Sequence, residues 1–248
     1  MEKQIIYVDM DNVLVDFQSA TQHLSQETLK EYEGRLDYVP GLFSLMRPLK
    51  DAIEAYYYLA EYFDVYILST APWNNPSAWS DKLLWVQKYL GDVAYKRLIL
   101  THHKDLNRGD YLIDDRKKNG ASEFHGTLIQ FGSEQFPNWH SVIDYFKTIV
   151  LLQQIKLPLS DEDYVTLREE ELRTNGVVWK LASKELRDSY EDLMLRWWGQ
   201  YQPKGTDAEI DDIIDLGMWY PPKTEKYKDY PNYKQTGRVK GVSSLMKD

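Results

Sequence analysis

Residues 5–17 read IIYVDMDNVLVDF, a short apolar run that ends in two carboxylates, Asp9 and Asp11. A continuous apolar run is typical of a central strand in a parallel sheet, because such a strand is buried on both faces. Burial does not explain Asp9 and Asp11, since a buried carboxylate costs free energy unless a metal or a charged partner compensates it. In open α/β sheets, ligands bind beyond the carboxyl ends of the strands. The stretch therefore predicts a metal and phosphate site at the end of the first strand.

Short apolar runs and helical patterns alternate after this stretch. Further strands are expected at residues 64–68, 97–100, 111–113 and 127–129. Helices are expected at residues 19–32, 48–63, 76–90, 161–173 and 179–198, and from about residue 138. In the helix at 76–90, apolar spacing places Trp79, Leu83, Val86 and Leu90 on one side. Strands that alternate with helices predict an α/β fold, with a mostly parallel sheet flanked by helices.

A change in sequence character predicts a boundary between two domains. Pro158 interrupts the apolar pattern, and a Ser-Asp pair of the helix N-cap type follows at 160–161. We expect residues 1–155 to form the core, with a short cap insert around residues 18–47. We expect residues 156–248 to form a mainly helical extension that ends in an irregular Tyr- and Lys-rich tail.

The composition narrows the classes of protein to which the chain can belong. Its 248 residues carry a formal net charge of −9, which argues against binding to a nucleic acid polymer but allows a small phosphorylated substrate. The absence of cysteine excludes disulfides, zinc-thiolate sites and thiol nucleophiles. No apolar run approaches the ~18–20 residues of a membrane-spanning helix, and no basic-then-apolar leader is recognised. We expect a soluble cytoplasmic protein with no membrane partner.

Polar side chains follow four of the predicted strands. They are Asp9 with Asp11, Ser69 with Thr70, Lys104, and Asp114 with Asp115. Because the carboxyl ends of parallel strands meet at one edge of a sheet, we expect these side chains to converge. Phosphoryl transfer depends mainly on positioning and on charge neutralisation, and each of these side chains suits one part of that task.

The two carboxylates of the first strand divide the covalent and proton-transfer roles. Asp9 would attack phosphorus and form a phosphoaspartyl intermediate. Asp11 would protonate the leaving oxygen and later accept a proton from the hydrolytic water. Ser69 would donate a hydrogen bond to a phosphoryl oxygen, with Thr70 as the alternative, and Lys104 would neutralise charge.

Oxygen atoms from the same strand ends predict a Mg²⁺ site. The expected ligands are Asp9, the backbone carbonyl of Asp11, and the pair Asp114 and Asp115. Either member of that pair can supply the direct contact. Carboxylate and carbonyl oxygens are the ligands that Mg²⁺ prefers, and the ion would let a carboxylate approach a phosphate of like charge.

In order along the chain, these motifs resemble those of the haloacid dehalogenase (HAD) superfamily. The motifs are Asp9-Met10-Asp11-Asn12-Val13, Leu68-Ser69, Lys104 and Ile113-Asp114-Asp115. The similarity is closest to the 5′(3′)-deoxyribonucleotidase branch, both in residues 9–17 and in further short stretches. These stretches are PGLF at 40–43, WV at 85–86 with LG at 90–91, and GDYLIDDR at 109–116. The resemblance spans about residues 4–147.

The resemblance implies a HAD-like Rossmannoid core and dephosphorylation of (deoxy)nucleoside monophosphates, with Phe17 and Phe43 lining the base or sugar pocket. Aromatic stacking tolerates different bases. Asn12 stands where the family usually has glycine, and asparagine tolerates left-handed backbone better than most residues. The segment that leads to Phe43 is short for this branch, and it builds the cap that selects substrates.

We therefore expect a Mg²⁺-dependent phosphomonoester hydrolase of the 5′(3′)-(deoxy)ribonucleotidase type, with a nucleoside monophosphate as its substrate. Two alternatives stay open. One is a HAD phosphatase for another small phosphoester, and the other is a non-catalytic binding or scaffold protein that uses the C-terminal extension. The base and sugar preference, 5′ versus 3′ selectivity and the formation of a homodimer also stay open.

Overall fold

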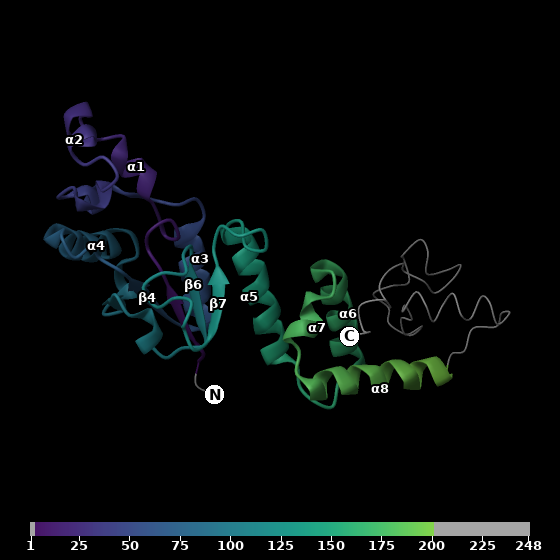
Figure 1. Cartoon of the computed structure of the whole chain (residues 1–248). Coiled ribbons are helices and arrows are strands. Elements are labelled where there is room, and N and C mark those ends of the chain that lie inside the picture. The colour runs from purple at the N-terminus through teal and green to yellow at the C-terminus, as the bar shows by residue number, and fades with distance from the viewer. Residues whose placement is uncertain (1–2, 201–248) are drawn as a thin grey trace. The chain divides into compact units, whose positions relative to one another are not determined.

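The computed structural model describes residues 3–200 of the chain (Figure 1). By compactness the chain divides into two units, unit 1 (Met1–Lys147) and unit 2 (Thr148–Asp248). The division falls inside helix α5 (Trp139–Gln154), ahead of the boundary predicted after residue 155. The predicted division into domains stays a prediction, and the irregular tail expected at the C-terminus lies outside the described residues.

A five-stranded parallel sheet in the order β5-β4-β1-β6-β7 forms the centre of unit 1. Its strands are β1 (Ile5–Val8), β4 (Asp64–Ser69), β5 (Leu98–Leu100), β6 (Tyr111–Asp114) and β7 (Thr127–Gln130). Each coincides with a predicted strand, so the predicted α/β fold is confirmed. A separate antiparallel ribbon joins β2 (Val15–Asp16) to β3 (Arg47–Pro48).

The central position of β1 follows from its sequence, because Ile6 and Val8 are fully buried on one face and Tyr7 is buried on the other. The chain passes from β1 to β4 and β5 on one side, and then returns to β6 and β7 on the other. Ligand crevices form where the strand order reverses in this way, beyond the carboxyl ends of the strands. The ends of β1 and β6 therefore mark the expected site.

Different segments cover the two faces of the sheet. On one face, Tyr7 and Leu112 pack with Phe124 from the segment between β6 and β7. On the other face lie α3 (Ala52–Tyr62) and α5, and Phe146 of α5 contacts the ring of Phe63 at a centroid distance of 5.3 Å. The sheet is thus covered on both sides, as its apolar strands require.

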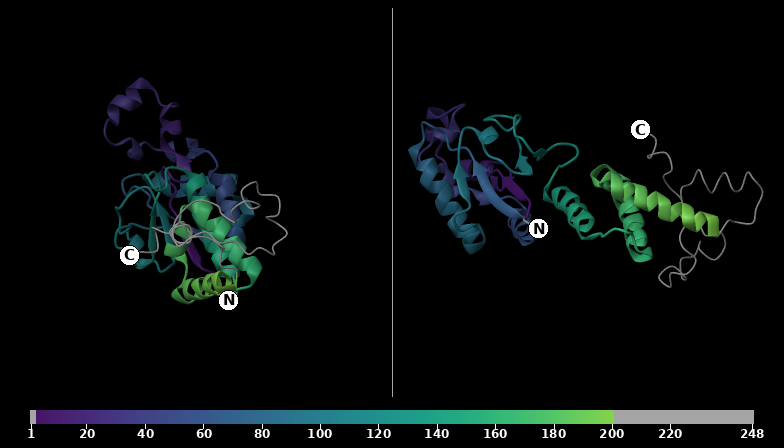
Figure 2. Two further views of the ribbon diagram at one scale, coloured as in Figure 1. Left: turned by 90° about the vertical axis from the view of Figure 1, so that its right-hand side faces the viewer. Right: turned by 90° about the horizontal axis from the view of Figure 1, so that it is seen from below.

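The cap lies at the carboxyl ends of the strands, where Figures 1 and 2 show it standing at one end of unit 1. It consists of α1 (Phe17–Thr21), α2 (Gln26–Glu31), η1 (Leu36–Tyr38) and η2 (Leu42–Leu45). The single helix predicted at 19–32 is wrong. Ser25 interrupts it, because its side chain accepts a hydrogen bond from the backbone N–H of Thr28 and so starts a new helix.

Helix α4 (Pro76–Tyr89) was predicted correctly as a helix but turns a different face inward. Its buried residues are Ala78, Asp81, Lys82, Trp85 and Val86. Of the four apolar residues predicted to share one side, Val86 and Leu90 are buried, whereas Trp79 and Leu83 are 37% and 46% exposed. Polar contacts decide the inward face as well as apolar ones, since the indole N–H of Trp85 donates to the buried carbonyl of Met46 at 3.0 Å.

Unit 2 contains three helices within the described residues after α5. They are α6 (Asp161–Thr174), α7 (Val177–Leu181) and α8 (Lys184–Gln200). Of the two predicted N-cap candidates, Ser160 and Asp161, it is Ser160 that caps α6, in a reciprocal capping box with Asp163. The single helix predicted at 179–198 is wrong, because Ala182 adopts an extended conformation (φ −68°, ψ 145°) between α7 and α8.

Aromatic packing holds the described part of unit 2 together. Tyr164 stacks on Tyr190 at a centroid distance of 4.6 Å, and Trp179 contacts Tyr190 at 4.5 Å. Arg168 and Glu171 form a buried ion pair beside them. Between residues 3 and 200, no helix has the length and apolar character needed to cross a membrane.

We predict that Trp139→Phe destabilises the protein. The indole N–H of Trp139 donates to the carbonyl oxygen of Val13 at 2.8 Å, and both residues are buried. The substitution removes this N–H donor and leaves the buried Val13 carbonyl without that partner. The free energy of unfolding, measured by urea titration, should fall by about 1–3 kcal/mol. Trp73→Phe is the matched control, because Trp73 is 78% exposed. Equal stability of the two variants would contradict this role.

Candidate active site

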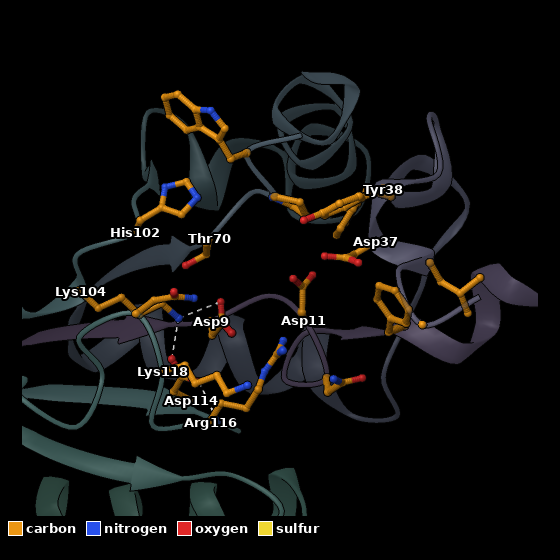
Figure 3. A pocket seen from close by; sticks show the side chains of 18 residues that line it. Asp9, Asp11, Asp37, Tyr38, Thr70, His102, Lys104, Asp114, Arg116 and Lys118 are labelled. Atoms are coloured by element: carbon orange, nitrogen blue, oxygen red, sulfur yellow. Dashed lines mark hydrogen bonds and ion pairs between the residues drawn. The ribbon is translucent and has the colours of Figure 1, made fainter. Parts of the chain in front are cut away.

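A cavity of about 560 Å³ opens at the carboxyl ends of the strands, in the size range of small-molecule sites (Figure 3). The predicted site residues that line it are Asp9, Asp11, Phe17, Phe43, Thr70, Lys104 and Asp114. Ser69 and Asp115 do not line it. The structure therefore brings most of the predicted residues together, from the ends of β1, β4 and β6, the loop after β5, and the cap.

Asp9, Lys104 and Asp114 form a buried charged triangle at the floor of the cavity (Figure 3). The Nζ atom of Lys104 lies 3.1 Å from Asp9 Oδ1 and 2.5 Å from Asp114 Oδ2. Burial alone would lower the pKa of Lys104, but the charges of Asp9 and Asp114 outweigh it and raise the pKa. Lys104 therefore stays cationic between two carboxylates.

Tight backbone geometry places Asp9 and Asp11 at this floor. The backbone N–H of Asp9 donates to the carbonyl of Ile113 at 2.9 Å, which continues the pairing of β1 with β6. Asn12 follows in the left-handed region at φ 57°, which asparagine tolerates better than most residues, as expected from the sequence. The turn leaves the side chain of Asp11 directed into the cavity (Figure 3).

Asp11 differs from Asp9 in its partner. Its Oδ1 atom accepts a hydrogen bond from Lys82 Nζ at 2.7 Å. Burial raises the pKa of Asp11, the charge of Lys82 lowers it, and nearby Asp9 raises it, with a net shift upward. A carboxyl group whose pKa is raised keeps its proton to a higher pH than an ordinary carboxyl group does, which suits a general acid.

Three carboxylates are close enough to share a cation. Asp9, Asp114 and Asp115 each offer an oxygen atom, and these atoms lie within 4.8 Å of one another. Burial, followed by the charge of Asp9, raises the pKa of Asp114 to about 6. Among residues 3–200, the buried Asp9 Oδ1 atom has no hydrogen-bond partner, although it lies 3.1 Å from Lys104 Nζ in an ion pair. This donor set fits a hard divalent cation.

Asp114 and Asp115, the two candidates for the direct contact with a cation, have different surroundings. Asp114 uses Oδ2 for Lys104 and accepts from the backbone N–H of Arg116 through Oδ1 at 2.8 Å. Within the described part of the chain, Asp115 has only long contacts, with Asn12 at 3.3 Å and Arg116 at 3.4 Å. Asp115 is thus the freer of the two to bind a cation. The side chain of Asp11 lies outside the acidic group, so its expected contribution rests on its backbone carbonyl.

Ser69 and Thr70 are placed differently from each other. Ser69 is completely buried, and its Oγ atom accepts a hydrogen bond from Lys82 at 3.0 Å. Thr70 lines the cavity, but its hydroxyl donates to the carbonyl of Thr101 at 2.8 Å. To donate to a phosphoryl oxygen, Thr70 would have to give up that bond, whereas the hydrogen of Ser69 is not committed to Lys82.

An aromatic wall from the cap faces the charged floor. Phe17 and Phe43 meet edge to face, with ring centroids 6.1 Å apart, and Tyr38 lines the same cavity. On the opposite rim, Trp73 contacts His102 edge to face at 6.0 Å. The cavity therefore combines one acidic and cationic end with an apolar, aromatic end, as a small phosphoester with a ring system would require.

Sequence reasoning missed Lys82, although a signal for it was present. Lys82 lies four residues after Ala78 and three before Trp85, so these three residues share one helical face. A lysine on the buried face of an amphipathic helix needs a buried acidic partner. The pattern of the larger apolar residues suggested another inward face and concealed this signal.

Comparisons with known proteins agree on one family. The family described as "5′ nucleotidase, deoxy (Pyrimidine), cytosolic type C protein" matches residues 24–143. A relative from Vibrio phage KVP40 is 60% identical over 144 residues, which cover 58% of this chain and 85% of the relative. A Bordetella pertussis relative is 34% identical over 137 residues, covering 45% and 74% of the two chains. Both relatives carry the curated name "Putative 5′(3′)-deoxyribonucleotidase".

We predict that Asp115→Asn weakens the binding of Mg²⁺. Loss of an outer-shell partner typically costs ~10–100-fold in metal affinity, and loss of a direct ligand should cost at least as much. Mg²⁺ should raise the melting temperature of the wild type, and this rise should disappear at the same Mg²⁺ concentration in the variant. Glu123→Gln, an equal charge change at an exposed position, is the control. If calorimetric titration showed that Asp115→Asn binds Mg²⁺ with unchanged affinity, Asp115 would be excluded as a ligand.

Proposed function

The chain belongs to the 5′(3′)-deoxyribonucleotidase family of HAD-like phosphatases, and from this premise we propose a Mg²⁺-dependent phosphomonoester hydrolase that acts on (deoxy)nucleoside monophosphates. The observation that carries the proposal is the cavity itself. Its floor combines Asp9, Asp11 and Lys104, and its wall is aromatic. The floor suits the phosphate and the wall suits the nucleoside. A cytoplasmic location and a homodimer stay predictions.

The first chemical step forms a covalent bond to Asp9. A carboxylate oxygen of Asp9 attacks phosphorus, the bond from phosphorus to the nucleoside oxygen breaks, and an aspartyl phosphate results. The departing oxygen takes a proton from Asp11, whose pKa is raised by burial. When bound at Asp9, Asp114 and Asp115, Mg²⁺ supplies positive charge that offsets the repulsion between carboxylate and phosphate.

The second step restores Asp9. Asp11, now ionised, accepts a proton from a water molecule that attacks the aspartyl phosphate, and the bond from phosphorus to Asp9 breaks. Inorganic phosphate leaves, and Asp11 regains the proton it needs for the next turnover. One carboxyl group therefore serves as acid and then as base.

Lys104 and the end of β4 would hold the phosphate during both steps. Lys104 lies 3.1 Å from Asp9, so its charge can bind both the attacking carboxylate and the phosphoryl oxygens. The uncommitted hydroxyl hydrogen of Ser69 supports its proposed role as a phosphate donor. Thr70 lines the cavity and remains the alternative.

Phe17 and Phe43 would bind the base or the sugar. Their edge-to-face arrangement presents an apolar surface to the cavity. Every base can stack on an aromatic ring, so we expect the protein to accept several nucleoside monophosphates and not one alone.

We predict that Asp9→Asn lowers phosphate release from deoxynucleoside monophosphates by at least about 10³-fold, because the amide cannot act as the nucleophile. Asp11→Asn should lower it by about 10²–10⁴-fold, since proton transfer is lost while the nucleophile remains. Both variants should keep the wild-type circular dichroism spectrum. Mg²⁺-dependent turnover retained by purified Asp9→Asn would reject the covalent mechanism.

We predict a higher kcat/KM for deoxynucleoside monophosphates than for sugar phosphates. Phe17→Leu should raise KM for the nucleotides by at least about fivefold, because a base stacked on an aromatic ring contributes ~1–3 kcal/mol. KM for sugar phosphates, which have no base to stack, should change less. Faster turnover of the sugar phosphates by the wild type would reject the nucleotide while leaving the phosphatase chemistry in place.

A further inference from the structure

Lys82 is a fully buried cation that the proposed reaction does not yet use. Its side chain is completely inaccessible to solvent, and it does not line the cavity. Lysine is almost never fully buried unless it is paired, because removing an ammonium group from water costs free energy. The partners of Lys82 therefore indicate why a lysine occupies this position.

Three groups surround the ammonium of Lys82, each from a different element. Its Nζ atom lies 2.7 Å from Asp11 Oδ1, 3.0 Å from Ser69 Oγ and 4.7 Å from the centroid of the Phe43 ring. An ammonium group has three N–H donors and no acceptor. A carboxylate, a hydroxyl and an aromatic face can use all three donors. The site is therefore fully satisfied around a cation.

The two buried lysines of the site serve different carboxylates. Lys104 contacts Asp9, which is the proposed nucleophile, and Asp114, which is another of the three carboxylates that could share a cation. Lys82 contacts Asp11, the carboxyl group that carries the proton in the proposed reaction. The contact engages Oδ1 of Asp11, and among residues 3–200 no hydrogen bond is made to its Oδ2 atom. Oδ2 is thus left for the leaving oxygen.

We propose that Lys82 is a positioning residue for proton transfer, which holds the carboxyl group of Asp11 in its reactive orientation and orients the hydroxyl of Ser69. This inference rests on the proposed function. Because the ammonium group only donates, Ser69 must accept its hydrogen bond, and the hydroxyl hydrogen of Ser69 points away from Lys82. One cation then fixes both the proton donor and the proposed phosphate donor.

A purely structural role explains the arrangement less well. A well-packed apolar residue in place of a buried ion pair is often neutral or stabilising, so a lysine is a poor choice for stability alone. The contact with Phe43 also connects Lys82 to the aromatic wall. Lys82 therefore lies where the proton donor, the phosphate contact and the nucleoside wall meet.

The leaving group provides the test of this role. A nucleoside monophosphate releases an alkoxide, which needs a proton, whereas 4-nitrophenyl phosphate releases a stable phenolate, which needs none. In Lys82→Met, kcat for a deoxynucleoside monophosphate should fall at least about 10²-fold with a small change in KM. The first turnover of 4-nitrophenyl phosphate, followed by stopped flow, should slow by less than about tenfold.

Two further variants keep the test decisive. Lys88→Met lies on the same helix at an exposed position and should behave as the wild type with both substrates. Lys82→Arg keeps the charge but not the geometry, so it should show the same leaving-group dependence if Lys82→Met does not fold. In an Asp11→Asn background, Lys82→Met should cause little further loss of kcat, because both changes act on one group.

The positioning role would be overturned if Lys82→Met lost equal rate with both leaving groups. It would also be overturned if Lys82→Met lowered kcat in the Asp11→Asn background as much as it does in the wild type. A wild-type protein without turnover of either phosphoester would instead refute the proposed function. The two failures are therefore distinguishable within one experiment.

Discussion

Buried carboxylates paired with buried lysines are the constraint on which unit 1 depends. Asp9, Asp11 and Asp114 are all at least 92% buried, and Lys82 and Lys104 lie among them. Breaking one such pair leaves an uncompensated charge in a low-dielectric interior, which typically costs 3–5 kcal/mol. The carboxylates, with Asp115 beside them, outnumber the buried lysines. A divalent cation bound there would balance the excess negative charge that the lysines leave.

Helix α4 joins this charged edge to the cap. Its N-cap residue, Asn75, donates through its side chain to the carbonyl of Val39 at 3.0 Å. Near its other end, Trp85 donates to the carbonyl of Met46 at 3.0 Å. Lys82 lies between these contacts. The same helix therefore contacts the cap backbone and carries the lysine that pairs with Asp11, and a shift of α4 would move both.

The convergence of the polar residues at the strand ends could be predicted from the sequence. These residues directly follow apolar runs, and parallel strands bring their carboxyl ends to one edge of the sheet. Lys82 could not be predicted in the same way. It lies 71 residues from Asp11 and 13 from Ser69, and the larger apolar residues of its helix suggested another inward face. Side-chain direction separates Ser69 from Thr70 as well, because Ser69 is buried beside Lys82 whereas Thr70 lines the cavity. Neighbouring residues at a strand end point to opposite sides, so only the structure shows that Thr70 faces the cavity.

The wall of the cavity is built separately from its floor. The ribbon of β2 and β3 closes the insert, where Ser19 Oγ accepts a hydrogen bond from the backbone N–H of Arg47 at 2.9 Å. The side chain of Asp16 caps α1, which begins at Phe17. Backbone contacts thus position Phe17, and a different side chain there would alter the substrate surface without moving the strand ends. Phe43 is the exception, because its ring also contacts Lys82, so the proposed substrate surface and the proposed proton donor share a neighbour there.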